Sequence, residues 1–182
     1  MTTLSWNCQG IGPPWKVRFL MDVISQERPN FVFLCETICK KEKMEFLRMK
    51  LGFEGMVVVD PQGRSGGLAF LWRECDQANL LSLSQHHIDV EVSVEGMGVW
   101  RITGMYGEPE RNNRRKTWDL LRNLSRDSNL PWCTIGDLNN VTSQQDKHGG
   151  ELYPTWLIDG FNEALTDVGL RDMELTCHQF TC

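Results

Sequence analysis

The chain has 182 residues, of which 41% are hydrophobic and 24% are charged, and this composition fits one globular domain with a sizeable core. No apolar run approaches the roughly 20 residues that a membrane helix needs, and the N-terminus lacks the pattern of a signal peptide, so we expect an intracellular protein without a membrane segment. The formal net charge of −5 argues against a general nucleic-acid binder.

From the N-terminus, strands and amphipathic helices alternate. A strand over residues 3–7 is followed by a helix over residues 15–26, which places four apolar side chains on one face. The continuous apolar run at residues 31–35 predicts a strand that is buried on both faces. A second amphipathic helix covers residues 40–53. The inward side chains of the first helix are Val17, Leu20, Met21 and Ile24.

Strands dominate the middle of the chain, and helices return toward its end. Two helices, over residues 114–126 and 154–170, flank a strand over residues 131–137, and a strand-like segment begins at residue 176. Helices at both ends of a strand-rich middle, without repeats or linkers, predict a single α/β layered domain over residues 1–182. The middle strands are expected at residues 55–60, 67–72, 79–84, 87–94 and 98–106. The inward side chains of the last two helices are Trp118, Leu121, Leu124, Leu157, Phe161, Leu165 and Val168.

The seven cysteines include no Cys-X-X-Cys pair. Cys8, Cys35 and Cys133 lie in apolar, strand-like contexts. We therefore expect reduced thiols that are mostly buried.

Polar residues stand where four of the predicted apolar strands end, each beside a turn signal. In layered α/β proteins, active groups tend to lie where strands end and loops begin, so these residues are candidates for one site. Polar residues also favour strand ends for structural reasons alone, and the candidates converge only if the strands align. They are Asn7, Glu36, Tyr106, Asp137 and Asn139.

This set of side chains suits metal-assisted attack of water on a phosphodiester. Glu36 is a hard oxygen ligand for Mg²⁺ or Mn²⁺, and Asn7 adds an amide oxygen or orients Glu36. Asp137 is placed to orient and deprotonate a water, while Asn139 and Tyr106 donate hydrogen bonds to a phosphoryl oxygen. The sequence holds no candidate Ser-His-Asp arrangement and no GxxxxGK[ST] loop, so nucleophilic catalysis fits less well.

A locally basic stretch, RNNRRK at residues 111–116, lies between the candidate residues Tyr106 and Asp137. Arg111, Arg114, Arg115 and Lys116 carry its charge. Two interpretations stay open, namely a solvated loop and a loop that contacts nucleic-acid phosphates.

Taken together, these segments resemble the endonuclease/exonuclease/phosphatase superfamily. LSWNCQGIG resembles its first motif, RPNFVFLCET its second, and GRSGGLAFLW its glycine-pair hairpin. HIDVEV resembles a middle strand, TGMYGEPE carries the superfamily tyrosine at Tyr106, and TIGDLNN resembles the GDxN motif. Within the superfamily, the sequence most resembles the endonuclease domain of plant LINE-type (non-LTR) retrotransposons. The resemblance is clearest in SQQDKHGG and in FNEALTDVGLRDMELTCHQFTC.

The resemblance implies a four-layered αββα sandwich and an endonuclease that nicks DNA to free a 3′-hydroxyl for reverse transcription. It implies that Glu36 binds Mg²⁺ or Mn²⁺ with Asn7 beside it, that Asp137 activates water, and that Asn139 and Tyr106 hold the phosphate. It further implies a nuclear, monomeric protein, with the possibility that the chain is part of a longer retroelement polyprotein.

The sequence departs from the superfamily pattern at its C-terminal end. The superfamily closes with a second essential Asp in a motif like SxLDR and with an SDH-like motif, and residues 1–182 contain neither. None of the four histidines, His86, His87, His148 and His178, stands in an SDH context. We therefore expect a fragment that lacks its last strands and is impaired as an enzyme. The alternatives are an inactive remnant that only binds a partner and a phosphatase of the same superfamily.

Overall fold

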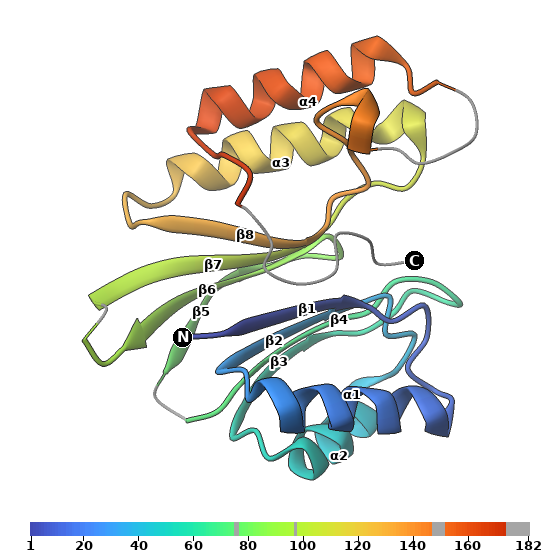
Figure 1. The fold of residues 1–182 in the computed structure, drawn as a ribbon, viewed down its shortest axis with the longest axis vertical. Coiled ribbons are helices and arrows are strands. Elements are labelled where there is room, and N and C mark those ends of the chain that lie inside the picture. Colours follow the sequence, from blue (N-terminus) through green and yellow to red (C-terminus); the bar gives the residue numbers. More distant parts are fainter. Residues whose placement is uncertain (75–76, 97, 147–151, 174–182) are drawn as a thin grey trace. The chain divides into compact units, whose positions relative to one another are not determined.

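The computed structural model of the protein describes residues 1–74, 77–96, 98–146 and 152–173. These residues form two compact units (Figure 1). The first, the sheet unit, comprises Met1–Pro109 and Leu130–Asn139, and the second, the helical unit, is formed by the remainder of the chain. The expectation of a single domain stays a prediction.

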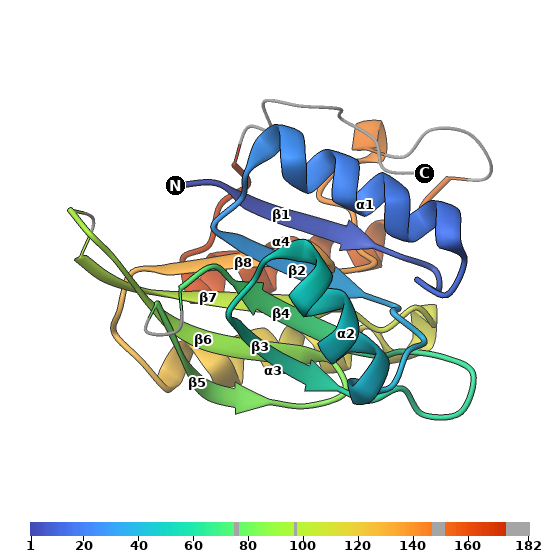
Figure 2. The ribbon, with the colours of Figure 1, turned by 90° about the horizontal axis from the view of Figure 1, so that it is seen from below.

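One four-stranded sheet of the sheet unit has the order β1-β2-β4-β3. Its strands β1 and β2 are parallel, whereas β2 and β3 both run antiparallel to β4. Figure 2 shows that helices α1 and α2 lie together on one face of this sheet. The strands are β1 (Thr3–Asn7), β2 (Phe31–Cys35), β3 (Gly55–Val59) and β4 (Leu68–Trp72), and the helices are α1 (Pro14–Glu27) and α2 (Lys41–Leu51).

The apolar faces of α1 and α2 cover this sheet as the periodicity predicts. Leu20 and Ile24 of α1 are buried in one cluster, against which Val17 and Met21 are partly buried. Each helix ends at a residue in the left-handed conformation, Arg28 after α1 and Gly52 after α2, whose N–H caps a carbonyl of the last turn. From α2 and the sheet, the cluster includes Met44, Leu47, Leu51, Val32, Leu34 and Leu71.

The second four-stranded sheet has the order β5-β6-β7-β8, in which only β7 and β8 are parallel. The two sheets share a second apolar cluster, in which Phe33 and Phe70 of the first sheet meet Val90 and Ile102 of the second. Every residue of β2 is buried, which confirms the expected strand with two covered faces. The strands of the second sheet are β5 (Ala78–Leu83), β6 (His87–Val94), β7 (Gly98–Tyr106) and β8 (Trp132–Asp137).

Two glycines of the second sheet let the Phe33 ring lie directly against its backbone. A Cβ added to Gly104 of β7 would clash with the Phe33 ring. A Cβ at Gly136 of β8 would lie 2.9 Å from Phe33 Cε1 and would also clash with the Met105 carbonyl. One aromatic ring and two missing side chains therefore set how closely β2 approaches β7 and β8.

The far face of the second sheet carries a buried ion pair. The Asp89 carboxylate receives two bonds of 2.9 Å from Nε of Arg101 and one of 2.7 Å from the Thr103 hydroxyl. Trp132 Nε1 donates to the same Thr103 oxygen at 2.7 Å. Arg101 Nη2 also lies 2.7 Å from Asp89 Oδ2, so the guanidinium and the Thr103 hydroxyl together satisfy a carboxylate that would otherwise be costly to bury.

The described part of the helical unit contains two α-helices and two short 3-10 helices. Trp118, Leu121 and Leu124 of the first helix are buried as expected, and Gly160 of the second admits the Trp118 ring against its backbone. The elements are η1 (Arg111–Asn113), α3 (Arg115–Arg126), η2 (Gln144–Asp146) and α4 (Thr155–Val168). On α4, Leu157 and Phe161 are buried as expected, together with Ile158 and Ala164, whereas Leu165 and Val168 are only partly buried.

Three further expectations concern the C-terminal strand, membrane helices and the cysteines. The strand-like segment expected from residue 176 lies outside the described residues. Across the part of the chain that the structure describes, no helix combines the length and the apolar character that crossing a membrane requires. Four described cysteines, Cys8, Cys35, Cys39 and Cys133, are free, and the first three of them are buried.

Gly104→Ala tests the close approach of the sheets. We expect the added methyl group to lower the free energy of unfolding by about 1–3 kcal/mol, the usual cost of overpacking a core. Chemical denaturation measures this, and a double-mutant cycle with Phe33→Leu should return part of the loss. Gly12→Ala is the matched control, because the nearest atom to its new Cβ, Lys43 Nζ, lies 3.8 Å away. Equal losses in the two alanine variants would contradict the proposed contact.

Candidate active site

The topology brings four of the candidate residues to matching ends of parallel strands. Asn7 is the last residue of β1, and Glu36 directly follows its parallel neighbour β2. Tyr106 and Asp137 are the last residues of β7 and β8, and they face each other in the parallel register. Each sheet therefore contributes two polar side chains from its carboxyl ends.

The side chain of Asn7 joins the two sheets. Its Nδ2 donates to Glu36 Oε1 at 3.1 Å and to Asp137 Oδ2 at 2.9 Å. The Tyr106 hydroxyl donates to the same Glu36 oxygen at 2.5 Å. The structure thus brings Asn7, Glu36, Tyr106 and Asp137 together in one hydrogen-bonded group, while their catalytic roles stay predictions.

Asn139 completes the turn that fixes Asp137. Its backbone N–H donates to Asp137 Oδ1 at 3.0 Å, and its own φ of 54° lies in the left-handed region. Its Nδ2 donates to the Gly107 carbonyl at 2.8 Å, and Gly107 N donates to the Asp137 carbonyl at 2.8 Å. A Cβ at Gly107 would clash with the Leu138 backbone, so the main chains of the loop after β7 and the loop after β8 lie in direct contact at this glycine. Both oxygens of Asp137 are thereby held, one by each asparagine.

The backbone around Glu36 is strained and locked by its neighbours. Gln9, Glu36 and Ile38 have φ values of 44°, 49° and 48°, which non-glycine residues seldom adopt. The Glu36 carbonyl accepts from Gly10 N at 2.7 Å, and Ile38 N donates to the Gly66 carbonyl at 3.1 Å. Such conformations persist where the surroundings determine them, and they are common at functional sites.

The electrostatics of the group keep Tyr106 protonated. Burial raises the pKa of its hydroxyl above the ordinary value, and the hydrogen bond to Glu36 and the nearby Asp137 charge raise it further. Burial, reinforced by the Asp137 charge, likewise raises the pKa of the Cys35 thiol to about 12. At neutral pH, Tyr106 is therefore a hydrogen-bond donor, and Cys35 is a neutral thiol rather than a nucleophile.

The donor atoms of this group fit a hard divalent cation. Two carboxylates, from Glu36 and Asp137, converge on a single neutral amide, and Mg²⁺ prefers one or two carboxylates together with waters. Residues 1–74, 77–96, 98–146 and 152–173 contain no group of three or more His, Cys, Asp or Glu residues suited to hold a metal. That Glu36 and Asn7 hold the metal stays a prediction, in which most of the coordination sphere would be water.

His86 and Glu108, to which the sequence analysis assigned no role in the site, lie at its edge. His86 Nδ1 lies 3.2 Å from the Tyr106 carbonyl, and its Nε2 lies 3.5 Å from Glu108 Oε1. The feature that could have pointed to His86 is the register of the β6–β7 hairpin, which places the residue before β6 opposite the last residue of β7. His87, in contrast, is buried between the hydroxyls of Ser82 and Ser84 at 2.9 and 2.8 Å. His148 and His178 lie outside the described residues.

The basic stretch lies in the helical unit and divides into two kinds of residue. Arg114 is buried, and its guanidinium lies 5.2 Å from the centre of the Tyr153 ring, which indicates a structural role. Arg111 also stacks on Tyr153, at 6.0 Å, but is exposed, as are Arg115 and Lys116. Phosphate binding by these residues stays a prediction.

A sequence profile of the Endonuclease/Exonuclease/phosphatase family matches residues 4–172. The chain belongs to this family. The match runs from β1 to beyond α4 and therefore includes all five candidate residues. Members of the family generally use a divalent metal, which agrees with the donor set. A comparison with curated protein sequences gives no match.

Solved structures of family members show the same fold. The 3′ phosphatase NExo from Neisseria, bound to a product DNA hairpin, matches with a TM-score of 0.64 and 15% identity, over 91% of this chain and 70% of that chain. An AP endonuclease from Archaeoglobus fulgidus matches with a TM-score of 0.64 and 14% identity, over 92% and 70%. The AP endonuclease LMAP from Leishmania major gives 0.62 and 14%, over 90% and 65%. These matches confirm the α/β class with two mixed sheets and flanking helices.

Tyr106→Phe tests the electrostatics of the site. The folded-state pKa of Tyr106 lies above its unfolded value of about 10, so its stabilisation is fully present below about pH 10 and is lost as the pH rises toward the folded pKa. We expect the free energy of unfolding to fall more steeply above about pH 10 in the wild type than in Tyr106→Phe. Denaturant titrations at several pH values measure both slopes.

An optical titration provides the control. The chain has two tyrosines, so subtracting the phenolate absorbance of Tyr106→Phe from that of the wild type isolates Tyr106. Ionisation of Tyr106 at or below about pH 10 would contradict the raised pKa.

Proposed function

We propose that this protein binds DNA and hydrolyses its phosphodiester backbone with the help of Mg²⁺ or Mn²⁺. The observation that carries the proposal is the Asn7 side chain, which bridges the carboxylates of Glu36 and Asp137 at 3.1 and 2.9 Å. It unites the candidate metal ligand and the candidate base from two different sheets in one small group.

Each side chain has a role that its contacts support. Asp137 orients the attacking water and accepts its proton, because Asn139 N and Asn7 Nδ2 fix the direction of its carboxylate. Tyr106 keeps its proton, and its hydroxyl, which donates to Glu36 in the structure, would turn to donate to the phosphoryl oxygen on which negative charge develops, with Asn139 beside it. Glu36 and Asn7 would hold the cation, which stabilises charge on the phosphoryl group when bound.

DNA is the proposed substrate because NExo was solved with a product DNA hairpin and two other matches are AP endonucleases. A retroelement origin, with a nick that supplies a 3′-hydroxyl for reverse transcription, is the finer part of the proposal. It is supported by the resemblance of residues 143–150 and 161–182 to the sequences of plant LINE-type endonucleases. The genomic sequence downstream of codon 182 tests it, because SxLDR and SDH motifs are expected there.

We further propose that hydrolysis by residues 1–182 alone is slow. In the described parts of the chain, the partners of the Asp137 carboxylate are Asn7 and Asn139, and no histidine is among them. A neutral amide orients a carboxylate but cannot take up its proton. A general acid–base group is typically worth a factor of about 10² to 10⁴ in rate.

Glu36→Gln tests the metal site without any measurement of activity. We expect weak binding of Mg²⁺ and Mn²⁺ by isothermal titration, because Mg²⁺ gives up its waters reluctantly, and we expect loss of binding in Glu36→Gln. Glu45→Gln, which changes a carboxylate on α2 that pairs with Arg48, is the matched control and should bind as the wild type does. Equal binding by Glu36→Gln would remove Glu36 from the site.

A nicking assay on supercoiled plasmid tests the reaction. We expect residues 1–182 to nick at background level, and we expect Mg²⁺-dependent nicking from a chain extended by a family-like segment with the LDR and SDH motifs. Asp137→Ala in the extended chain should abolish it. Robust nicking by residues 1–182 that is lost on Asp137→Ala would show that another group supplies the missing role. His86, His148 and His178 would be the residues to replace next.

The same assays separate the alternative activities. Release of inorganic phosphate from a 3′-phosphorylated oligonucleotide, without nicking, would favour a phosphatase. Binding of DNA without either reaction in the extended chain would favour an inactive remnant.

A further inference from the structure

Helices α1 and α2 leave a trough between them on the face of the first sheet that they cover. One hollow of about 420 Å³ has an apolar floor that includes Val17, Met21, Met44 and Leu47. A neighbouring hollow of about 450 Å³ is also lined by Met21 and Lys50, so the two hollows adjoin each other along the helices. We call this feature the α1–α2 trough.

Every charged side chain that lines the trough is basic. No Asp or Glu is among the lining residues of either hollow, and none of the basic residues forms an ion pair with a described residue. This is notable in a chain whose formal net charge is −5. The basic residues are Arg18, Arg28, Lys43, Lys50 and Arg73.

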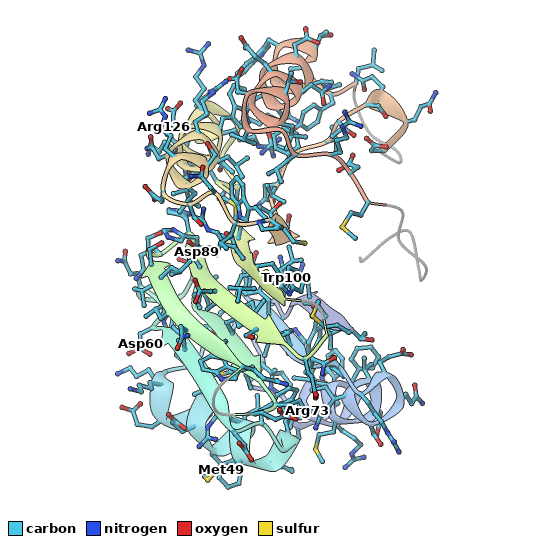
Figure 3. The ribbon with its side chains drawn as sticks, turned by 90° about the vertical axis from the view of Figure 1, so that its left-hand side faces the viewer. Met49, Asp60, Arg73, Asp89, Trp100 and Arg126 are labelled. Atoms are coloured by element: carbon cyan, nitrogen blue, oxygen red, sulfur yellow. The ribbon has the colours of Figure 1, made fainter. Side chains whose placement is uncertain are left out.

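Large apolar side chains on the same two helices face solvent. Phe46, which lines the trough, is 65% exposed, and Met49 on α2 is 61% exposed. On α1, Trp15 and Phe19 are 65% and 52% exposed. Of these side chains, Phe46 lines the trough itself, and an exposed aromatic ring beside an apolar floor with a basic rim is the kind of surface that marks protein association. Figure 3 shows that side chains from the lower helices, among them Met49, project outward.

We propose that the α1–α2 trough binds an acidic amphipathic helix of a partner protein. The apolar floor matches the i, i+3, i+4 and i+7 anchors of such a helix, and the basic rim matches its acidic flanks. The 14 residues of α1 span about 21 Å at about 1.5 Å per residue, which suits three to four turns of partner helix. A nucleic acid matches less well, because its phosphate backbone offers no continuous apolar ridge for the floor.

The trough is distinct from the candidate active site. Its floor belongs to the cluster beneath α1 and α2, whereas Glu36, Tyr106 and Asp137 stand at the strand ends. A partner bound in the trough would bring this protein to its target or to a second activity without covering the site.

Display selection tests the proposal with the full 182-residue chain as bait. The probe is a library of 16-residue segments with apolar residues at i, i+3, i+4, i+7, i+8 and i+11 and with Glu or Asp at the other positions. A library with Lys or Arg in place of the acids is the control. We expect enrichment from the acidic library alone, and we expect the selected peptides to bind Arg18→Glu/Lys43→Glu/Lys50→Glu at least tenfold more weakly.

Matched variants keep the result interpretable. Arg64→Glu/Arg126→Glu/Arg171→Glu changes net charge equally at exposed positions outside the trough and should bind as the wild type does. Phe46→Ser should weaken binding without lowering the unfolding midpoint, since Phe46 is largely exposed. Equal enrichment from both libraries, unchanged binding by the trough variant, or displacement of the peptides by a 20-base-pair DNA duplex would overturn the proposal.

Discussion

The contact of Phe33 with the backbones of Gly104 and Gly136 sets the geometry on which the candidate site depends. Asp137 follows Gly136 directly, and Glu36 lies three residues after Phe33. The distance between the sheets at this point therefore decides whether one asparagine side chain can reach both carboxylates. Core packing therefore determines site geometry. A methyl group added at either glycine would move the site residues of the first sheet away from those of the second.

The site itself works against the stability of the fold. Two carboxylates approach the same amide, and the phenol of Tyr106 loses solvent beside them. The strained backbone at Gln9, Glu36 and Ile38 adds to this cost. A partly buried phenol and a strained backbone lower stability while they hold the polar side chains in fixed positions, which is the usual relation between stability and activity at such sites.

The sequence predicted the parts of this structure that depend on local periodicity. The apolar run of β2 indicated a strand with two covered faces, and the spacing of Leu20 and Ile24 indicated the buried face of α1. Residue types at strand ends pointed to Asn7, Glu36 and Asp137. What local pattern could not supply was strand order, because β2 pairs with β4 rather than β3, and only long-range pairing decides this. The position of His86 beside Tyr106 depends on hairpin register, and the burial of Arg114 depends on the distant Tyr153 ring.

The hydrogen bond between Asn7 and Asp137 joins residues that are 130 positions apart in the chain. During synthesis, at roughly 5 to 20 residues per second, Asn7 leaves the ribosome many seconds before Asp137 exists. The first sheet needs only residues up to Trp72, so it can pair while the second is still being made. Strand β8, which carries Asp137, is the last described strand of the sheet unit in chain order and forms one edge of the second sheet. The nascent chain therefore carries Glu36 without its counterpart while the residues between them are made, and the charged corner of the protein forms only once β8 has been synthesised.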